Sequence, residues 1–297
     1  MCATWNVNAK FPSESDDLKQ WLLPENTAAP DIYAIGLQEI VDLNVMNIVL
    51  KNSATVETSA IWVHKFSKIL NTIDYYKVLL DKSMVGICFV IFVKASLHSC
   101  IRDVKYSLTY TGSYGVTGNK GGVTISMRIH DSPVCFVCAH FHANRDAVQY
   151  RNLDYELIVN NKEFISVGPE LLDHEYIFWM GDLNYRLNED IEIVEIFERL
   201  YNDTWETLRS SDQLLQEKAK QNIFHGFNEG LLSFPPTYKY QPGTDKYERR
   251  IDKKLRAPAW CDRILYRSTR IDRDITLLYY RVSPLHMSDH KPISAMF

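Results

Sequence analysis

The sequence predicts one domain of the α/β or α+β class. Strand-like apolar runs recur along the chain with amphipathic helical patterns between them, which is typical of sheets covered by helices. With 46% hydrophobic residues among 297, the chain can bury a substantial core, and no repeat or Gly/Ser-rich linker divides it. We therefore expect a single domain over residues 1–297, cut from a longer protein because its first strand-like stretch has no lead-in.

The individual elements follow from the periodicity of apolar residues. Strands are predicted at 84–93, 122–129, 133–141, 175–180, 261–266 and 275–282. Helices are predicted near 14–23, 61–73, 145–165, 191–201 and 212–222. In the third helix the apolar side expected to face a sheet consists of Val148, Leu153, Leu157, Ile158 and Phe164. The stretch 233–260 is a long loop bearing Pro, Lys and Arg, and such loops are more often functional than idle.

Composition argues against several classes of protein. The net charge of −4 gives the molecule no general attraction for polyanions, so an anionic substrate needs a local basic cluster. The chain has neither an apolar run of the ~18 residues that a membrane span needs nor a signal-peptide stretch. Cys135 and Cys138 would point to opposite faces of a strand, which disfavours a zinc site. We expect a reduced, cytoplasmic protein.

Polar side chains gather where strands end. In "WMGDLNYR", residues 179–186, Asp182 and Asn184 are two apart and would share one face of extended backbone. Similar positions hold Asn6, Asn8, Glu39, His140, His142, Asp262, Asp289 and His290. Each alone is better explained as a turn residue or a solvated side chain. Together they offer oxygen ligands for a hard cation such as Mg²⁺ and groups for hydrolysing a phosphate ester.

A family resemblance accompanies these residues. The motifs "TWNVN", "GLQE", "GNKGG", "AHFHA", "GDLNYR", "FPPTYKY", "RAPAWCDRIL" and "SDHKPI" resemble, in this order, those of the inositol polyphosphate 5-phosphatases. The resemblance runs from Thr4 to Phe297. It implies the deoxyribonuclease I-like four-layer sandwich, in which two packed β-sheets are flanked by helices. It also implies a phosphoric monoester hydrolase that needs Mg²⁺.

The resemblance assigns the metal and the attacking water. In the family the Glu of "LQE" holds the Mg²⁺, which falls on Glu39, assisted by the Asn of "WN", here Asn6. The Asp of "GDLN" positions and deprotonates the water, which falls on Asp182. Asn184 would then lie beside it at the phosphate.

The resemblance also assigns the groups that meet the phosphate. The His of "SDH" contacts the scissile phosphate, which falls on His290, and the Asp of "CDR" that pairs with it is Asp262. His140 and Asp289 complete the inner ring.

The chain departs from the family in one loop. Many relatives read H-L-A-A-H where this sequence has "HFHAN", so that Asn144 replaces a second His and His142 is added. Asn144 can donate a hydrogen bond but carries no charge.

The long loop indicates the substrate. Residues 239–256 hold seven basic residues against three acidic ones, although a solvated charged loop is a common alternative. By resemblance Tyr238, Lys239, Lys254 and Arg256 bind the inositol 4-phosphate, and Lys120 makes a further phosphate contact from a Gly-rich turn. A compact cluster suits a polyphosphorylated ring better than a nucleic-acid duplex.

The expected substrate is phosphatidylinositol 4,5-bisphosphate, with related phosphoinositides or soluble inositol polyphosphates, and no nucleic acid. The alternatives are a phosphodiesterase or nuclease on the same fold and a catalytically silent phosphoinositide-binding module. We expect a monomeric catalytic domain that contacts the membrane surface peripherally. Val45, Met46, Ile48 and Val49 are equally consistent with a loop that enters the bilayer and with a helix packed on the sheet.

Overall fold

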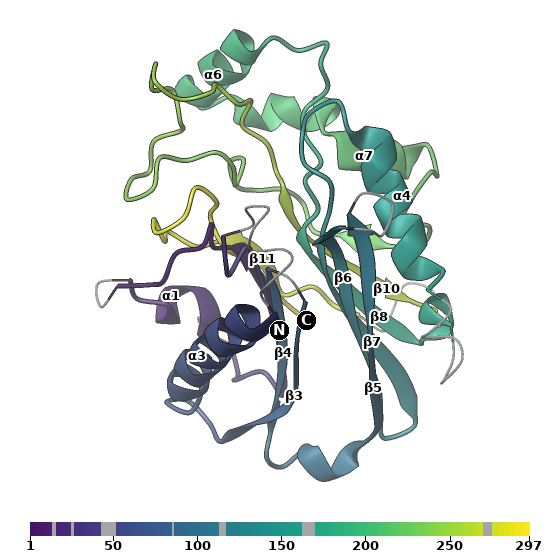
Figure 1. Cartoon of the computed structure of the whole chain (residues 1–297). Helices are drawn as coiled ribbons and strands as arrows, with labels where there is room; N and C mark the ends of the chain where they lie inside the picture. The colour runs from purple at the N-terminus through teal and green to yellow at the C-terminus, as the bar shows by residue number, and fades with distance from the viewer. Residues whose placement is uncertain are drawn as a thin grey trace.

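Two β-sheets packed face to face form the centre of the molecule (Figure 1). The computed structural model describes residues 1–13, 16–24, 27–42, 52–84, 86–112, 117–161, 170–269 and 275–297. In this part of the chain each sheet has six strands, and helices cover the outer faces. The predicted four-layer sandwich is therefore confirmed.

The first sheet joins the N-terminal strands to the last strands of the chain, in the order β11–β12–β1–β2–β4–β3. Its strands are β1 (Cys2–Asn6), β2 (Ile32–Gln38), β3 (Tyr76–Met84), β4 (Ile87–Lys94), β11 (Tyr279–Val282) and β12 (Ile293–Met296). β1 and β2 are parallel, and the other neighbours are antiparallel.

The second sheet has the order β5–β6–β7–β8–β10–β9. Its strands are β5 (Ile101–Gly112), β6 (Thr117–Ile129), β7 (Ser132–His140), β8 (Tyr176–Asp182), β9 (Asn228–Glu229) and β10 (Asp262–Ser268). It also contains one parallel pair, β7 and β8, among antiparallel neighbours.

The main core lies between the sheets. It includes Phe89 and Ile91 of β4 from the first sheet with Ile125 of β6 and Phe136 of β7 from the second. The sheets approach so closely that a Cβ added at Gly36 would lie 2.4 Å from the Cys138 sulfur. A side chain at this position would push the two layers apart.

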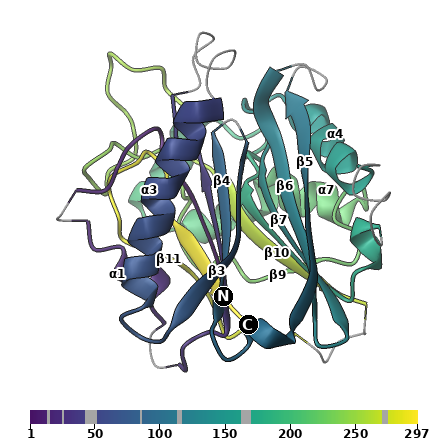
Figure 2. The same cartoon turned by 60° about the horizontal axis from the view of Figure 1, so that its bottom comes forward.

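Helices bury one face each against the outer sides of the sheets (Figure 2). α1 (Lys19–Leu22) and α3 (Asn52–Leu70) cover the first sheet, where Trp62 packs near Trp5. α4 (Val148–Val159) and α7 (Gln213–Ala219) cover the second sheet, where Tyr155 packs against Trp179. The remaining helical elements are α6 (Ile193–Tyr201), η1 (His98–Cys100), η2 (Leu171–Asp173) and η3 (Trp205–Ser211). No helix in the described ranges combines the length and the apolar character of a membrane span.

The predicted inner face of α4 is only partly correct: Ile158 is buried and Val148 packs against the same core cluster, whereas Phe164 lies outside the described residues. The buried residues of the helix are Arg151, Asn152, Asp154, Tyr155 and Ile158, while Leu157 is 37% exposed. Two polar members of this face, Arg151 and Asp154, bind the loop that follows β7. A helix that serves as a scaffold for a polar loop does not show the apolar stripe of a core helix.

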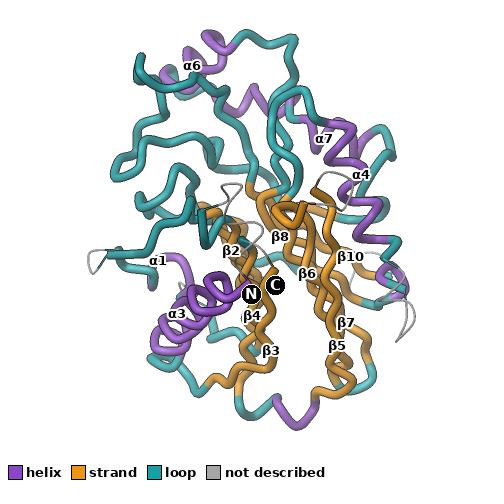
Figure 3. The backbone as a smooth tube through the Cα atoms, viewed as in Figure 1, coloured by secondary structure: helices purple, strands orange, loops and turns teal. Residues whose placement is uncertain are grey.

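The long loop at 233–260 is confirmed as irregular backbone, and after its predicted role we call it the substrate loop. Its two ends are held together by an isolated bridge between Tyr238 and Ala259, and Tyr238 also bridges to His290. Figure 3 shows that loops, rather than strands, occupy the end of the molecule where α6 lies.

Candidate active site

The first sheet contributes Asn6 and Glu39 from the ends of its parallel pair. β1 and β2 run parallel with Asn6 opposite Gln38, so both strands end at the same edge of the sheet. The Asn6 side-chain amide donates to Glu39 Oε1 at 3.1 Å and to Asp182 Oδ2 at 2.9 Å. Its oxygen accepts from the Asn8 backbone N–H at 3.0 Å, which fixes the orientation of the amide. Asn6 therefore holds two carboxylates together.

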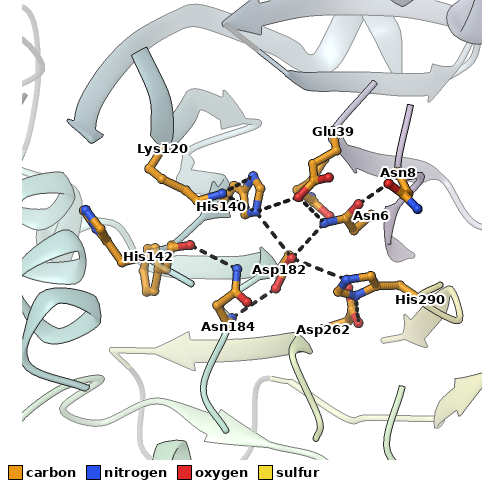
Figure 4. A network of polar contacts seen from close by, with 12 residues as sticks. Asn6, Asn8, Glu39, Lys120, His140, His142, Asp182, Asn184, Asp262 and His290 are labelled. Atoms are coloured by element: carbon orange, nitrogen blue, oxygen red, sulfur yellow. Dashed lines mark hydrogen bonds and ion pairs between the residues drawn. The ribbon is translucent and has the colours of Figure 1, made fainter. Parts of the chain in front are cut away.

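The second sheet contributes His140 and Asp182 in the same way. β7 and β8 are parallel with His140 directly opposite Asp182. Gly181 precedes Asp182 with φ +143°, and a Cβ there would lie 1.9 Å from the Ala139 carbonyl oxygen. His140 Nε2 is 3.4 Å from Asp182 Oδ2 and 3.6 Å from Glu39 Oε1, so the two sheets meet at one polar ring (Figure 4).

Asp182 is the centre of this ring. Its side chain is 1% exposed, and its second oxygen accepts from the Asn184 backbone N–H at 3.1 Å. Burial alone would raise the pKa of Asp182, but the nearby His290 and His140 rings and the Asn6 amide hold that pKa below the ordinary aspartate value. The group is thus a carboxylate at neutral pH, able to accept a hydrogen bond from water.

Asp262 and His290 form a pair that also spans the sheets. Asp262 opens β10 opposite Asp182, and His290 precedes β12. His290 Nδ1 lies 2.9 Å from Asp262 Oδ2, which also accepts from the Thr237 hydroxyl at 2.6 Å. His290 Nε2 faces Asp182 Oδ2 at 3.9 Å.

This pair favours the protonated imidazole. Burial alone would lower the pKa of His290, but Asp262 and Asp182 raise it to about 9. Burial raises the pKa of Asp262 above its ordinary value despite the neighbouring imidazole. His290 is therefore a cation at neutral pH, as expected for a histidine held against a carboxylate.

Asn184 differs from its predicted geometry. β8 ends at Asp182, and Asn184 has φ +55°, so the two side chains do not share a face of extended backbone. Its amide donates to the Phe141 carbonyl at 3.0 Å, and its oxygen accepts from Arg186. Asparagine tolerates left-handed backbone, which explains why the chain can turn here.

Lys120 lies in strand β6 and not on the predicted Gly-rich turn. The next residue, Gly121, lacks a side chain because a Cβ there would lie 1.9 Å from the Thr109 carbonyl oxygen. Lys120 Nζ contacts His140 Nε2 at 2.8 Å, and burial lowers the pKa of Lys120 below its usual value. The residue thus adjoins the ring described above.

The substrate loop places two of its predicted residues, Tyr238 and Lys239, against the segment that carries Asp289 and His290. Tyr238 packs on the His290 ring with centroids 4.6 Å apart, and Lys239 Nζ lies 3.2 Å from Asp289 Oδ2. Asp289 therefore pairs with this loop, and among the described residues its carboxylate makes no hydrogen bond or ion pair with Asp182 or His140. Arg256 is half-buried.

Lys254 is exposed. The apolar residues Val45, Met46, Ile48 and Val49, considered above for membrane contact, lie outside the described residues.

The loop after β7 is held by α4. His142 Nδ1 lies 2.8 Å from the buried Asp154 carboxylate, and Arg151 donates to the Asn144 carbonyl at 2.6 Å. Asn144 adopts φ +82°, and its side-chain oxygen lies 3.4 Å from an Arg256 nitrogen. The Asn that replaces the usual His thus adjoins the substrate loop.

Two residues of the site were not predicted. The Arg186 guanidinium stacks over the Tyr238 ring at 4.4 Å, and the Thr237 hydroxyl binds Asp262. Both belong to motifs quoted above, "GDLNYR" and "FPPTYKY". In the sequence, only their position beside predicted site residues could have indicated them.

The ring offers a set of ligands for a cation. One atom each from Glu39, His140 and Asp182 lies within 4.8 Å of the others. Two carboxylates suit a hard divalent cation that stays partly hydrated. Glu39 is the member that reaches solvent, with 32% of its side chain exposed. The donor set therefore fits Mg²⁺, with Asn6 orienting the carboxylates instead of offering its own oxygen.

Comparison with known proteins identifies the family. A family model described as "Endonuclease/Exonuclease/phosphatase family 2" matches residues 3–296. Type I inositol polyphosphate 5-phosphatase 8 of Arabidopsis thaliana is 34% identical over 342 residues, covering 99% of this chain and 69% of that protein. The chain belongs to the inositol polyphosphate 5-phosphatases. The family predicted from the motifs is confirmed.

Other members of the 5-phosphatase family extend the comparison. Human synaptojanin-1 is 35% identical over 335 residues, covering 99% of this chain, which spans only 21% of that protein's length. The crystal structure of the inositol polyphosphate 5-phosphatase domain of SPsynaptojanin is 32% identical with a TM-score of 0.85, covering 99% of this chain and 82% of that one. That crystal contains inositol (1,4)-bisphosphate and a calcium ion.

Proposed function

We propose that this chain hydrolyses the 5-phosphate of phosphatidylinositol 4,5-bisphosphate and related phosphoinositides or soluble inositol polyphosphates, with Mg²⁺ as cofactor. The observation that carries the proposal is the ring around the Asp182 carboxylate, in which Asn6 links Asp182 to Glu39 and His290 Nδ1 lies 2.9 Å from Asp262 Oδ2. The solved relative was crystallised with an inositol bisphosphate, which supports the proposed class of substrate.

Each residue of the ring would have a separate role in hydrolysis. When bound at Glu39, Mg²⁺ would neutralise negative charge on the phosphoryl oxygens. Asp182 would orient the attacking water and accept its proton, because it is a buried carboxylate at the centre of the ring. The His290 imidazolium would donate a charged hydrogen bond to a phosphate oxygen as negative charge develops there.

The substrate loop would select the inositol ring. Lys239, Lys254 and Arg256 are basic side chains on one loop whose Tyr238 contacts His290. We propose that they bind the 4-phosphate, with Lys120 reaching a phosphate from the His140 side. Asp289 would orient Lys239 for this purpose.

The proposal also covers the protein that contains this domain and its location in the cell. We propose a monomeric catalytic domain of a longer cytoplasmic protein, working at the periphery of a membrane that carries its lipid substrate. The length of a relative supports the proposal of a longer protein, because this chain spans only 21% of human synaptojanin-1.

The test compares two substrates. Phosphate release from vesicles bearing phosphatidylinositol 4,5-bisphosphate is measured by malachite green, beside nicking of supercoiled plasmid DNA. Release without nicking is expected. Nicking without release would establish the phosphodiesterase alternative, and binding of the lipid without either reaction would establish the silent module.

A further inference from the structure

The tip of the substrate loop exposes apolar side chains among basic ones. Residues 249–256, which we call the tip, include five basic residues, one acidic residue and two aliphatic ones. Ile251 is 104% exposed and Leu255 is 46% exposed. A single exposed aliphatic residue is unremarkable on a protein surface, but two on one basic loop of an acidic protein form a pattern found at interaction surfaces.

The basic side chains of the tip remain at the surface. Arg250 binds Glu248, and Lys253 approaches only its neighbour Asp252, at 3.7 Å. Arg249 lies over the Phe197 ring of α6 at 4.8 Å. Arg249 and Lys253 are exposed and have no assigned role in substrate binding, so their charge is available to an external anionic surface.

The tip is attached firmly to the catalytic ring. The Glu248 backbone N–H donates to the Lys239 carbonyl at 2.8 Å, and Tyr240 stacks on Tyr247 with centroids 4.3 Å apart. The same segment carries Tyr238, which packs on His290. A surface bound by the tip would therefore be held in a fixed position relative to the catalytic ring. Figure 1 shows that α6, against which the tip packs, lies at an outer end of the molecule.

We propose that the tip docks on an anionic membrane, with Ile251 entering the apolar boundary, Leu255 beside it, and Arg249 and Lys253 against lipid headgroups. An aliphatic side chain flanked by Lys and Arg is the pattern that interfacial membrane segments use. The inference rests on the proposed function in one respect, since a lipid substrate would be drawn from this surface.

The experiment measures vesicle binding apart from catalysis. Sedimentation is compared for the parent, Ile251→Asp and the control Leu278→Asp, on phosphatidylserine–phosphatidylcholine vesicles without phosphoinositide. Leu278 is 54% exposed beside β11, which makes it a matched control. We expect Ile251→Asp to weaken binding about tenfold, the order expected for losing one buried aliphatic side chain. Leu278→Asp should bind as the parent does.

Kinetics keep the two proposals distinguishable. On soluble inositol 1,4,5-trisphosphate, kcat/KM of Ile251→Asp should equal that of the parent, whereas KM on vesicle-borne substrate should rise. Equal vesicle binding by parent and Ile251→Asp would overturn docking by the tip. Docking by the tip would also be overturned if the parent bound phosphatidylcholine vesicles as well as it binds vesicles that contain phosphatidylserine. Failure of the parent to bind any vesicle would overturn it too, and is the result expected if the tip binds an acidic protein. Failure of the parent to release phosphate from the soluble substrate would instead overturn the proposed function.

Discussion

Asp182 receives contacts from both sheets, and a single atom change tests its role. Replacing Asp182 by Asn keeps the size of the side chain but removes its ability to take a proton from water. We expect kcat to fall by about three orders of magnitude, in the range typical of general-base loss, while KM changes little. Steady-state kinetics on soluble inositol 1,4,5-trisphosphate measure both. Unchanged turnover in this variant would refute the assignment.

Glu39 is the partly exposed carboxylate of the ring, and its charge is the feature that would hold Mg²⁺. Glu39→Gln preserves the shape of the side chain, so the fold should survive. We expect turnover to fall by several orders and Mg²⁺ binding, followed by calorimetry, to weaken in parallel. Circular dichroism checks the fold. If EDTA leaves the parent fully active, the metal assignment is wrong.

At this scale residue types were predictable, but local geometry was not. The motifs indicated Asn184 and Lys120 as site residues, yet Asn184 occupies left-handed backbone and Lys120 lies in a strand. The reason for Lys120 lies outside its own motif, because the following glycine is required by the Thr109 carbonyl of the neighbouring strand. Such a contact between distant segments leaves no local sequence pattern.

Among elements, strands with uniformly apolar runs were predictable, including the edge strand β11 within the predicted range 275–282, but other edge strands were not. β3 and β5 had no prediction, and both lie at the edges of their sheets. Their residues are largely exposed or half-buried, so neither shows a uniformly apolar run. Edge strands tend to carry charged side chains that prevent association with other strands, which weakens the apolar signal.

The substrate loop yields a prediction about selectivity. Lys239→Ala and Arg256→Ala each remove a charged hydrogen bond that we assign to the 4-phosphate, about 1.5–3 kcal/mol. We expect kcat/KM on the 4,5-bisphosphate headgroup to fall by about one to two orders of magnitude. The comparison is a substrate that bears the 5-phosphate without the 4-phosphate, on which the penalty should nearly vanish. An equal loss on both substrates would mean that the loop serves another purpose.

For the molecule as a whole, the site exists only because the two sheets pack together. Asn6, Glu39 and His290 come from segments of the first sheet, whereas His140, Asp182 and Asp262 belong to the second. The hydrogen bond between Asn6 and Asp182 joins residues 176 positions apart. Periodicity identified strands but contained no information on which faces meet. The layering therefore came from the family resemblance.

The Asp262–His290 pair joins the two sheets, and its role can be tested through the pH dependence of turnover. His290 has its pKa raised to about 9, so in the parent the ring stays protonated through neutral pH and loses its proton only as pH approaches that value. Asp262→Asn removes the acid that contributes most to this rise. Asp182 remains at 3.9 Å and continues to favour the cation, so the pKa should fall without reaching that of an unassisted buried histidine.

We therefore expect the basic limb of the pH–rate profile of Asp262→Asn to move to lower pH, because the ring becomes neutral sooner and donates a weaker hydrogen bond. The loss of turnover relative to the parent should grow between about pH 6 and 8, the range in which histidine ordinarily titrates. His290→Ala should cost at least as much at every pH, and the double variant should add little, since the two residues act as one unit. The measurement is kcat against pH for all four proteins on the soluble substrate. If the basic limb of Asp262→Asn coincides with that of the parent, Asp262 only joins the sheets and does not set the charge of His290.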